Sequence, residues 1–135
     1  MAKKEKFTTL DAALQTPEKV EILQLNSAKD LRPDIAKLPN LKELTVWMKG
    51  VKKVPQEIGE LTSLVKLDLS NNDISKLPES IGNLKNLKQL KLKENPLKGL
   101  PASIGKLKKL QVLHLSNFQF TEIPEAIYTL GNLKD

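Results

Sequence analysis

The chain has 135 residues, which fits a single domain, and its apolar content of 39% is enough for a core. Only 4% of the residues are aromatic, so leucine and isoleucine must build that core. The net charge of +6 comes from lysine, because Arg32 is the single arginine, and this composition favours a solubilising lysine surface over the arginine-rich, aromatic sites that read nucleic acid.

The start of the chain, MAKKEKFTTLDAAL, is basic but lacks the apolar segment of a secretion signal. No stretch approaches the roughly 18 apolar residues of a membrane span. The chain contains no cysteine, which argues against disulfide-stapled extracellular caps and fits a reducing compartment. We therefore expect a cytoplasmic protein without a membrane segment.

From residue 41 onward a unit of 23 residues repeats without slipping register. An irregular first copy begins at Val20 and is two residues shorter. The later copies begin at five leucines: Leu41, Leu64, Leu87, Leu110 and Leu133. No copy can bury its apolar face alone, so the copies must stack into a solenoid. A solenoid offers a long regular surface rather than a deep pocket, which shifts the expected function from catalysis toward binding.

Within one copy, L-x-x-L-x-L predicts a short strand whose leucines point to one side. Leu67 should therefore be fully buried, as should Leu90 and Leu113 at the same place in the next copies. Pro78 should stop the strand pairing, and residues 79–82 should form a short helical return on the outer face.

An asparagine follows the strand in two copies, at Asn72 and Asn95. A buried amide at this place can donate to and accept from the backbone of adjacent turns, so we interpret both residues as a structural asparagine ladder. Ala28, Lys49 and Phe118 occupy the same place in the other copies and break the ladder.

The strand motif L-x-x-L-x-L-x-x-N, followed by L-P-x-x-I-G-x-L, resembles leucine-rich repeat proteins of the 23-residue subclass, with bacterial and Ras-associated intracellular members. The resemblance covers residues 20–133. It implies an α/β fold, a right-handed curved stack with a parallel concave sheet and short helical or irregular convex turns. It also implies an N-terminal tail and helical cap in residues 1–19. Residues 20–135 would hold about five repeats, the first irregular and the last truncated.

Parallel strands would place equivalent outward residues about 4.8 Å apart, in columns along the concave face. One column is predicted to contain Gln24, Thr45, Asp68, Lys91 and His114. A second is predicted to contain Ile22, Glu43, Lys66, Gln89 and Val112. A third is predicted to contain Asn26, Trp47, Ser70, Lys93 and Ser116.

These columns argue against catalysis. His114 is the single histidine, and Asp68 would lie two strands away, roughly 10 Å, with Lys91 between them. A catalytic base needs its orienting carboxylate at about 3 Å. One histidine and no cysteine leave no metal-ligand pattern, and no glycine-rich phosphate loop occurs. We expect no enzymatic activity, no metal and no cofactor.

The predicted binding site is the concave face, with Trp47 and Met48 as its apolar part. Tryptophan is enriched in interface hot spots, and methionine adapts to irregular partners. The alternative is that Trp47 lies flat over Lys66 or Ile22 and shields the irregular second repeat. The candidate partner-binding residues are Trp47, Met48, Thr45, Lys66, Asp68, Lys91, Lys93 and His114.

Charge is the second feature of this face. We expect lysines to gather near its centre with two carboxylates interspersed: Lys66, Lys88, Lys91 and Lys93 with Asp68 and Glu94. They form either a solvated mixed-charge face or a docking patch for an acidic protein segment. The sequence therefore predicts a protein-binding scaffold, without membrane contact and with nucleic acid disfavoured by the lack of an arginine cluster.

The C-terminal end supplies the alternative function, a structural or self-associating module that makes contact there. Tyr128 replaces the glycine found in three earlier copies, which suggests a modified last repeat. We expect residues 124–130 to fold back as a partial lid over the last layer. The residues expected to seal that layer are Phe118, Phe120, Tyr128 and Leu133. We expect a monomer, with end-to-end dimerisation through this surface as the alternative.

Overall fold

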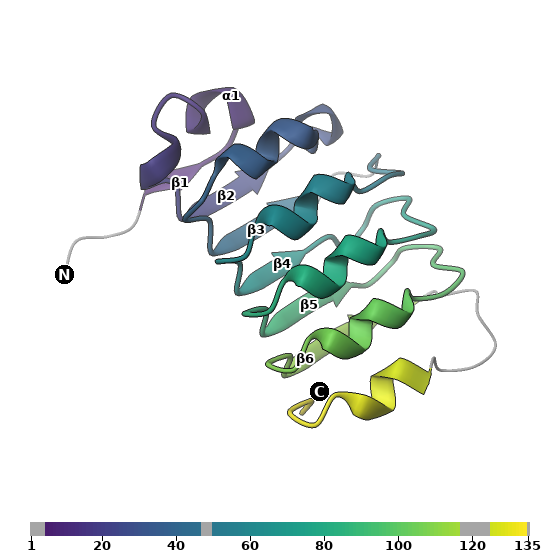
Figure 1. Cartoon of the computed structure of the whole chain (residues 1–135). Helices are drawn as coiled ribbons and strands as arrows, with labels where there is room; N and C mark the ends of the chain where they lie inside the picture. The colour runs from purple at the N-terminus through teal and green to yellow at the C-terminus, as the bar shows by residue number, and fades with distance from the viewer. Residues whose placement is uncertain (1–4, 47–49, 117–124, 135) are drawn as a thin grey trace.

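A computed structural model describes residues 5–46, 50–116 and 125–134. Within these ranges, six parallel strands form one open sheet in sequence order (Figure 1). The strands are β1 (Lys6–Phe7), β2 (Ile22–Leu25), β3 (Glu43–Val46), β4 (Lys66–Asp68), β5 (Gln89–Leu92) and β6 (Val112–Leu115). Each strand pairs with its neighbours in the sequence, which confirms the predicted parallel solenoid.

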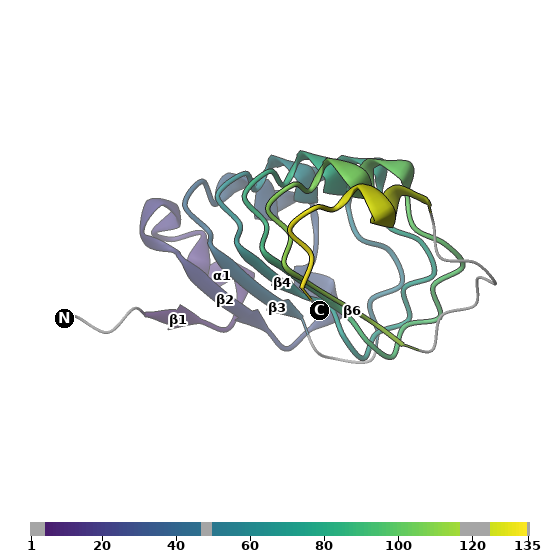
Figure 2. The same cartoon turned by 90° about the horizontal axis from the view of Figure 1, so that it is seen from below.

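A row of 3-10 turns runs along the side away from the sheet (Figures 1 and 2). The turns are η3 (Pro33–Lys37), η4 (Gln56–Glu60), η5 (Glu79–Asn83), η6 (Ala102–Lys106) and η7 (Glu125–Thr129). A proline stands directly before η4, η5 and η6, with φ between −65° and −71°, the range that its ring imposes. The predicted helical return on the outer face is confirmed, with 3-10 geometry.

The core lies between the sheet and the turns, and leucines fill it in register. One row joins the same position of five strands: Leu23, Leu44, Leu67, Leu90 and Leu113. The first four have at most 1% of their surface exposed. Leu113 is half buried, so the prediction of full burial is wrong for this residue. No further described strand stacks on the outer side of β6, and a thin repeat buries its core only between two neighbours.

Neighbouring turns approach one another closely at the glycines of η4 and η5. A Cβ atom on Gly59 would lie 2.6 Å from the carbonyl oxygen of Ser80, and one on Gly82 would lie equally close to that of Ser103. The glycines therefore allow the next turn to approach. Tyr128 holds the same position in η7, where its side chain meets no following turn and is 75% exposed.

The expectation of a lid over the last layer is wrong for the part that is described. Residues 125–129 continue the row of turns as η7 and do not fold across the end of the sheet (Figure 1). Tyr128 is exposed rather than sealed, Leu130 is buried and Leu133 is half buried. Phe118, Phe120 and Pro124 lie outside the described residues.

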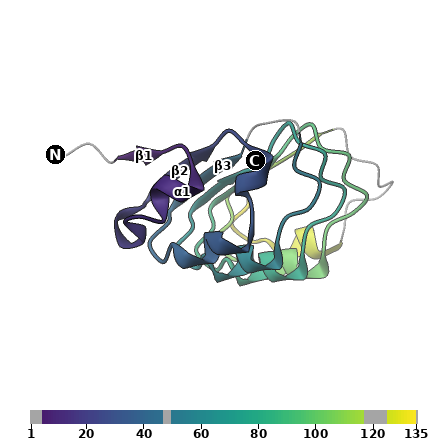
Figure 3. The ribbon, with the colours of Figure 1, turned by 90° about the horizontal axis from the view of Figure 1, so that it is seen from above.

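The opposite end of the stack carries α1 (Leu10–Ala13), η1 (Pro17–Lys19) and the two-residue strand β1 (Figure 3). β1 extends the sheet by pairing with β2, a strand that no sequence pattern indicated. Thr9 caps α1 by accepting a hydrogen bond from the amide of Ala12 at 3.2 Å. In the irregular first copy, η2 (Ala28–Asp30) occupies the place of the extended loop that asparagine supports in later copies.

Candidate protein-binding face

The outward side chains of the strands form the concave face, and the strand register sets their columns. Thr45, Asp68, Lys91 and His114 follow one another across β3 to β6 in Cα-paired order. Lys66 stands in the next column, between Glu43 and Gln89. Trp47 and Met48 lie outside the described residues.

Two lysines toward the N-terminal side of this face are held in ion pairs. The Nζ atom of Lys42 lies 3.1 Å from an Oε1 oxygen of Glu21, and that of Lys66 lies 3.3 Å from Oε1 of Glu43. Both lysine side chains are about half exposed, at 49% and 51%. Lys66 was expected in one patch with Lys91, but its charge is already balanced within the face.

Three lysines around β5 have no such partner. Lys88, Lys91 and Lys93 make no ion pair with any described residue, and we call them the β5 lysine cluster. Nearby carboxylates have other contacts: Asp68 Oδ1 accepts from the amide of Ser70 at 3.0 Å. The positive charge of the face therefore concentrates on a single repeat.

The asparagine ladder lies behind the face, inside the fold. The Asn72 amide donates to the carbonyl oxygens of Val46 and Leu69, at 2.8 and 3.0 Å, and its Oδ1 accepts from the Val51 amide. Asn95 makes the equivalent bonds one repeat later, donating to Leu69 O at 2.8 Å. The exposed fractions of the two residues are 4% and 0%. Both side chains connect neighbouring repeats through backbone groups and face no open surface.

The face does not bring catalytic groups together. Asp68 and His114 stand in one column with Lys91 on the strand between them. Two strand spacings amount to roughly 10 Å, beyond the contact that a base and its orienting carboxylate require. Across the described ranges, no group of three or more histidine, cysteine or acidic side chains is placed to hold a metal ion. In the same ranges no helix is long and apolar enough to cross a bilayer.

A family profile for the leucine-rich repeat region matches residues 13–95 and 79–135. The chain belongs to the leucine-rich repeat family. Leucine-rich repeat proteins are generally scaffolds for protein interaction and typically non-enzymatic. No curated protein sequence matches this chain.

Solved leucine-rich repeat structures share the fold. A leucine-rich repeat protein of Leptospira interrogans is 27% identical, with a TM-score of 0.64 over 97% of this chain and 46% of that one. The ectodomain of the plant membrane receptor kinase GASSHO1/SCHENGEN3 from Arabidopsis thaliana, in complex with CASPARIAN STRIP INTEGRITY FACTOR 2, is 27% identical. Its TM-score is 0.71 over 95% of this chain and 19% of that one.

Internalin C2 from Listeria monocytogenes is 19% identical, with a TM-score of 0.74 over 95% of this chain and 55% of that one. At this identity the likeness concerns the fold alone. The chain spans less than two thirds of the length of each of the three leucine-rich repeat structures.

Sequence reasoning missed the role of Arg32 at the N-terminal end of the leucine-rich repeat stack. Its guanidinium lies 2.8 Å from Asp11 on α1, 3.3 Å from Asp30 and 3.5 Å from Asp34. The hydrogen bond to Asp11, together with the charges of Asp11 and Asp34, raises the pKa of Arg32 above its ordinary value. Asp30 also accepts from the amide of Leu10 at 3.2 Å, so this cluster ties the cap to the first repeat. The signal in the sequence that could have indicated this cluster is a single arginine among many lysines, close to several aspartates.

Two further hydrogen-bond ladders join the leucine-rich repeats on their outer side. Ser80 and Ser103 each donate to a carbonyl oxygen 24 residues earlier, at 2.6 Å. Asn86 and Asn132 donate to carbonyl oxygens 24 residues earlier, at 2.8 and 2.6 Å. Their recurrence at a spacing of one or two repeats was visible in the sequence, but small polar residues on outer turns also occur without such bonds.

Proposed function

We propose that this protein binds another protein through its concave face, and that the contact centres on Trp47 and the β5 lysine cluster. The observation that carries the proposal is that neighbouring lysines of this face differ in whether they form an ion pair. Lys66 is paired with Glu43, whereas Lys91 and Lys93 have no ion pair among the described residues. Unpaired charge on a regular surface favours a partner that supplies the opposite charge.

The partner in this proposal presents an acidic segment. Surface charges of this kind mainly accelerate the encounter, whereas a buried aromatic side chain supplies most of the affinity. Trp47 and Met48 would supply that apolar contact, and Thr45, Asp68, Lys66 and His114 would surround it. The membership of the chain in a family of protein-interaction scaffolds supports this division of roles.

A pull-down from the native cell, with wild type and Trp47→Ala as baits, tests the proposal. Once the partner is captured, titration calorimetry should show that Trp47→Ala weakens binding by about 2 kcal/mol or more. The Lys91→Gln/Lys93→Gln variant should slow association and reduce its dependence on salt. Lys85→Gln/Lys106→Gln, on the outer turns, is the control with the same change of charge. An equal loss in this control would move the site away from the concave face.

The proposal also includes a division of the chain and a compartment. Residues 1–19 act as the cap and residues 20–135 as the binding stack, a division that the contacts of Arg32 with Asp11 support. A cytoplasmic location is favoured by the absence of cysteine. Cell fractionation with an antibody against the folded protein checks the compartment.

Half-buried core leucines at the C-terminal end favour a second candidate, self-association. Leu113 and Leu115 are half buried, whereas Leu90 and Leu92 at the same positions of β5 are 0% exposed. Apolar side chains and an edge strand can recruit another chain. Sedimentation at high micromolar concentration separates the candidates: we expect a monomer, and a dimer abolished by Tyr128→Lys would support self-association.

A further inference from the structure

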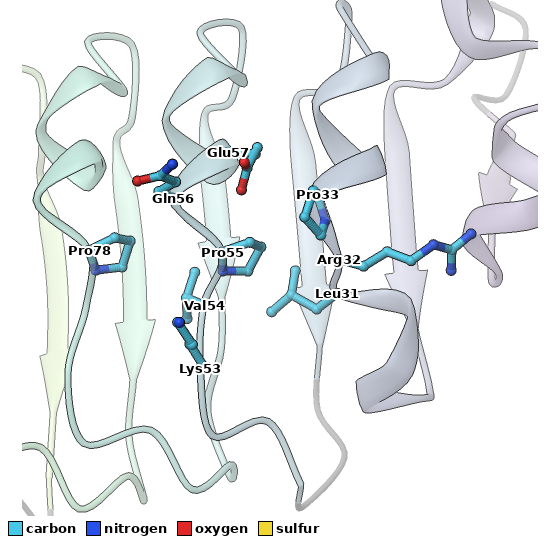
Figure 4. Close-up of a pocket in the computed structure, with 9 residues that line it drawn as sticks. All are labelled: Leu31, Arg32, Pro33, Lys53, Val54, Pro55, Gln56, Glu57 and Pro78. Atoms are coloured by element: carbon cyan, nitrogen blue, oxygen red, sulfur yellow. The ribbon is translucent and has the colours of Figure 1, made fainter.

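A second hollowed surface runs along the side of the stack, between the loops that leave the strands and the 3-10 turns. Its first part is a hollow of about 650 Å³ (Figure 4). A hollow of about 380 Å³ shares Lys53, Val54 and Pro78 with the first. A third, of about 450 Å³, shares Ser75, Lys76 and Leu77 with the second. Together they form the lateral groove, lined by residues 31–33, 52–57, 75–79 and 98–102.

The floor of the lateral groove is apolar and regular. Pro55 and Pro78 stand at the same position of successive repeats, one step apart along the groove (Figure 4). Pro101 takes that position in the next repeat. Beside the prolines, Val54 and Leu77 are buried. The three prolines are half buried, so each step presents part of an apolar ring.

The two walls of the groove carry opposite charges. Lys53 and Lys76 hold the same position in successive repeats, and Lys98 lies next to that position in the following one. All three are exposed, and none makes an ion pair with another residue in the described part of the chain. Glu57 and Glu79 line the groove on the other side of the prolines. One wall is therefore a row of unpaired cations spaced by one repeat.

We propose that the lateral groove docks an acidic, extended segment of a protein. An extended chain advances about 3.3 Å per residue, so about four residues reach across three repeats spaced about 4.8 Å apart. In that position its carboxylates face the lysine row while its apolar side chains cover the proline steps. Charge complementarity to the lysine row is what selects this occupant.

The groove is poorly suited to single-stranded nucleic acid. Such ligands require aromatic platforms for base stacking, and no aromatic residue lines the groove. Its single arginine, Arg32, is already held by Asp11, Asp30 and Asp34 and points away from the prolines (Figure 4). A polypeptide is therefore the occupant that this surface favours.

Gly99 offers a variant that should strengthen docking. It holds the position of Lys53 and Lys76 in the following repeat, beside Lys98, so Gly99→Lys would add a cation in register with those two lysines. Apart from its two chain neighbours, no residue lies within 4 Å of a Cβ placed on Gly99, and its backbone is not left-handed. The variant should therefore fold normally. Glu79→Gln, which removes a competing carboxylate from the other wall, should act in the same direction.

The experiment titrates the isotope-labelled full chain with a ten-residue peptide of alternating glutamate and proline, which proline keeps extended. Amide signals of residues 52–54, 75–77 and 98–100 should shift. Lys53→Gln/Lys76→Gln should weaken binding about threefold or more, and Gly99→Lys should strengthen it by a similar factor. Lys85→Gln/Lys106→Gln carries the same charge change on the outer turns and should have less effect.

Four results would overturn the proposal. The first is that amide signals shift only in residues 88–93, and the second is that Lys85→Gln/Lys106→Gln weakens binding as much as Lys53→Gln/Lys76→Gln does. The third is that a glutamine–proline peptide binds as tightly as the glutamate–proline peptide, and the fourth is that a ten-nucleotide oligothymidine binds the groove more tightly than that peptide. Trp47→Ala should leave peptide binding unchanged, so the test is independent of the concave face. A failure of the groove and a failure of the proposed function are therefore distinguishable.

Discussion

The two ends of the repeat stack differ in how completely the core is covered. At the N-terminal end, Leu23 and Leu25 of β2 are 0% exposed beneath β1 and α1. At the C-terminal end, Leu113 and Leu115 of β6 are half buried, although the sequence assigns them the same positions. The position of a leucine in the repeat thus directs its side chain toward the core. Full burial also needs a neighbouring repeat on each side.

The largest expected effect tests this comparison directly. Leu23→Ala and Leu90→Ala each empty a fully enclosed site and should lower the free energy of unfolding by about 2–5 kcal/mol. Leu113→Ala removes the same atoms from a half-open site and should cost less, about 2 kcal/mol or below. Urea denaturation of the three variants measures the difference. Equal losses would show that β6 is covered in solution.

The glycine positions of the turns provide the next comparison. Gly82→Ala would place a Cβ 2.6 Å from Ser103 in the following turn and should cost about 1–3 kcal/mol of unfolding free energy. Tyr128→Ala changes the equivalent residue of η7, which is exposed, and should stay within about 0.5 kcal/mol. Thermal unfolding of the pair gives both values. A large loss for Tyr128→Ala would mean that another surface packs on this end.

The asparagine ladder belongs to the interior of the stack, and its removal should act there. Asn95→Leu leaves the amide of Ile74 without its acceptor and removes one of the two side-chain donors to the carbonyl of Leu69, at a cost of about 1–3 kcal/mol. Asn83→Leu, on an exposed turn position, is the matched control and should be nearly neutral. Chemical denaturation of both variants is the measurement. Equal effects would contradict the structural role of Asn95.

The smallest expected effect concerns the N-terminal end of the stack, which the cap covers. Arg32→Gln breaks the contacts with Asp11 and Asp30, so the cap should detach more often from the first repeat. Amide hydrogen exchange should accelerate in residues 5–14 and stay unchanged in residues 110–116. The difference from wild type should shrink at high salt, because the contacts are electrostatic. Lys37→Gln, which breaks an exposed pair with Asp34, is the control. Unchanged exchange in residues 5–14 would show that the contacts of Arg32 do not hold the cap.

Much of the fold and of the concave face was readable from the pattern, because the 23-residue period sets the register of the strands from β3 to β6. The columns through Thr45, Asp68, Lys91 and His114 follow from this register alone. Which lysines carry free charge was not readable. Lys66 and Lys91 share the concave face, yet Lys66 forms an ion pair with Glu43 on the neighbouring strand. The regular spacing of the leucines does not specify which charged side chains pair between neighbouring repeats.

The sequence by itself determined the repeat length, the leucines available for the core, the asparagine ladder and the parallel order of the strands. These features recur every 23 residues, so local pattern and stacking point to the same answer. Only the tertiary structure decided the burial of Leu113, the cap contacts of Arg32 and the lateral groove. Each of these features depends on side chains brought together from different repeats, or on whether a neighbouring layer is present. The sequence of a single repeat specifies neither condition.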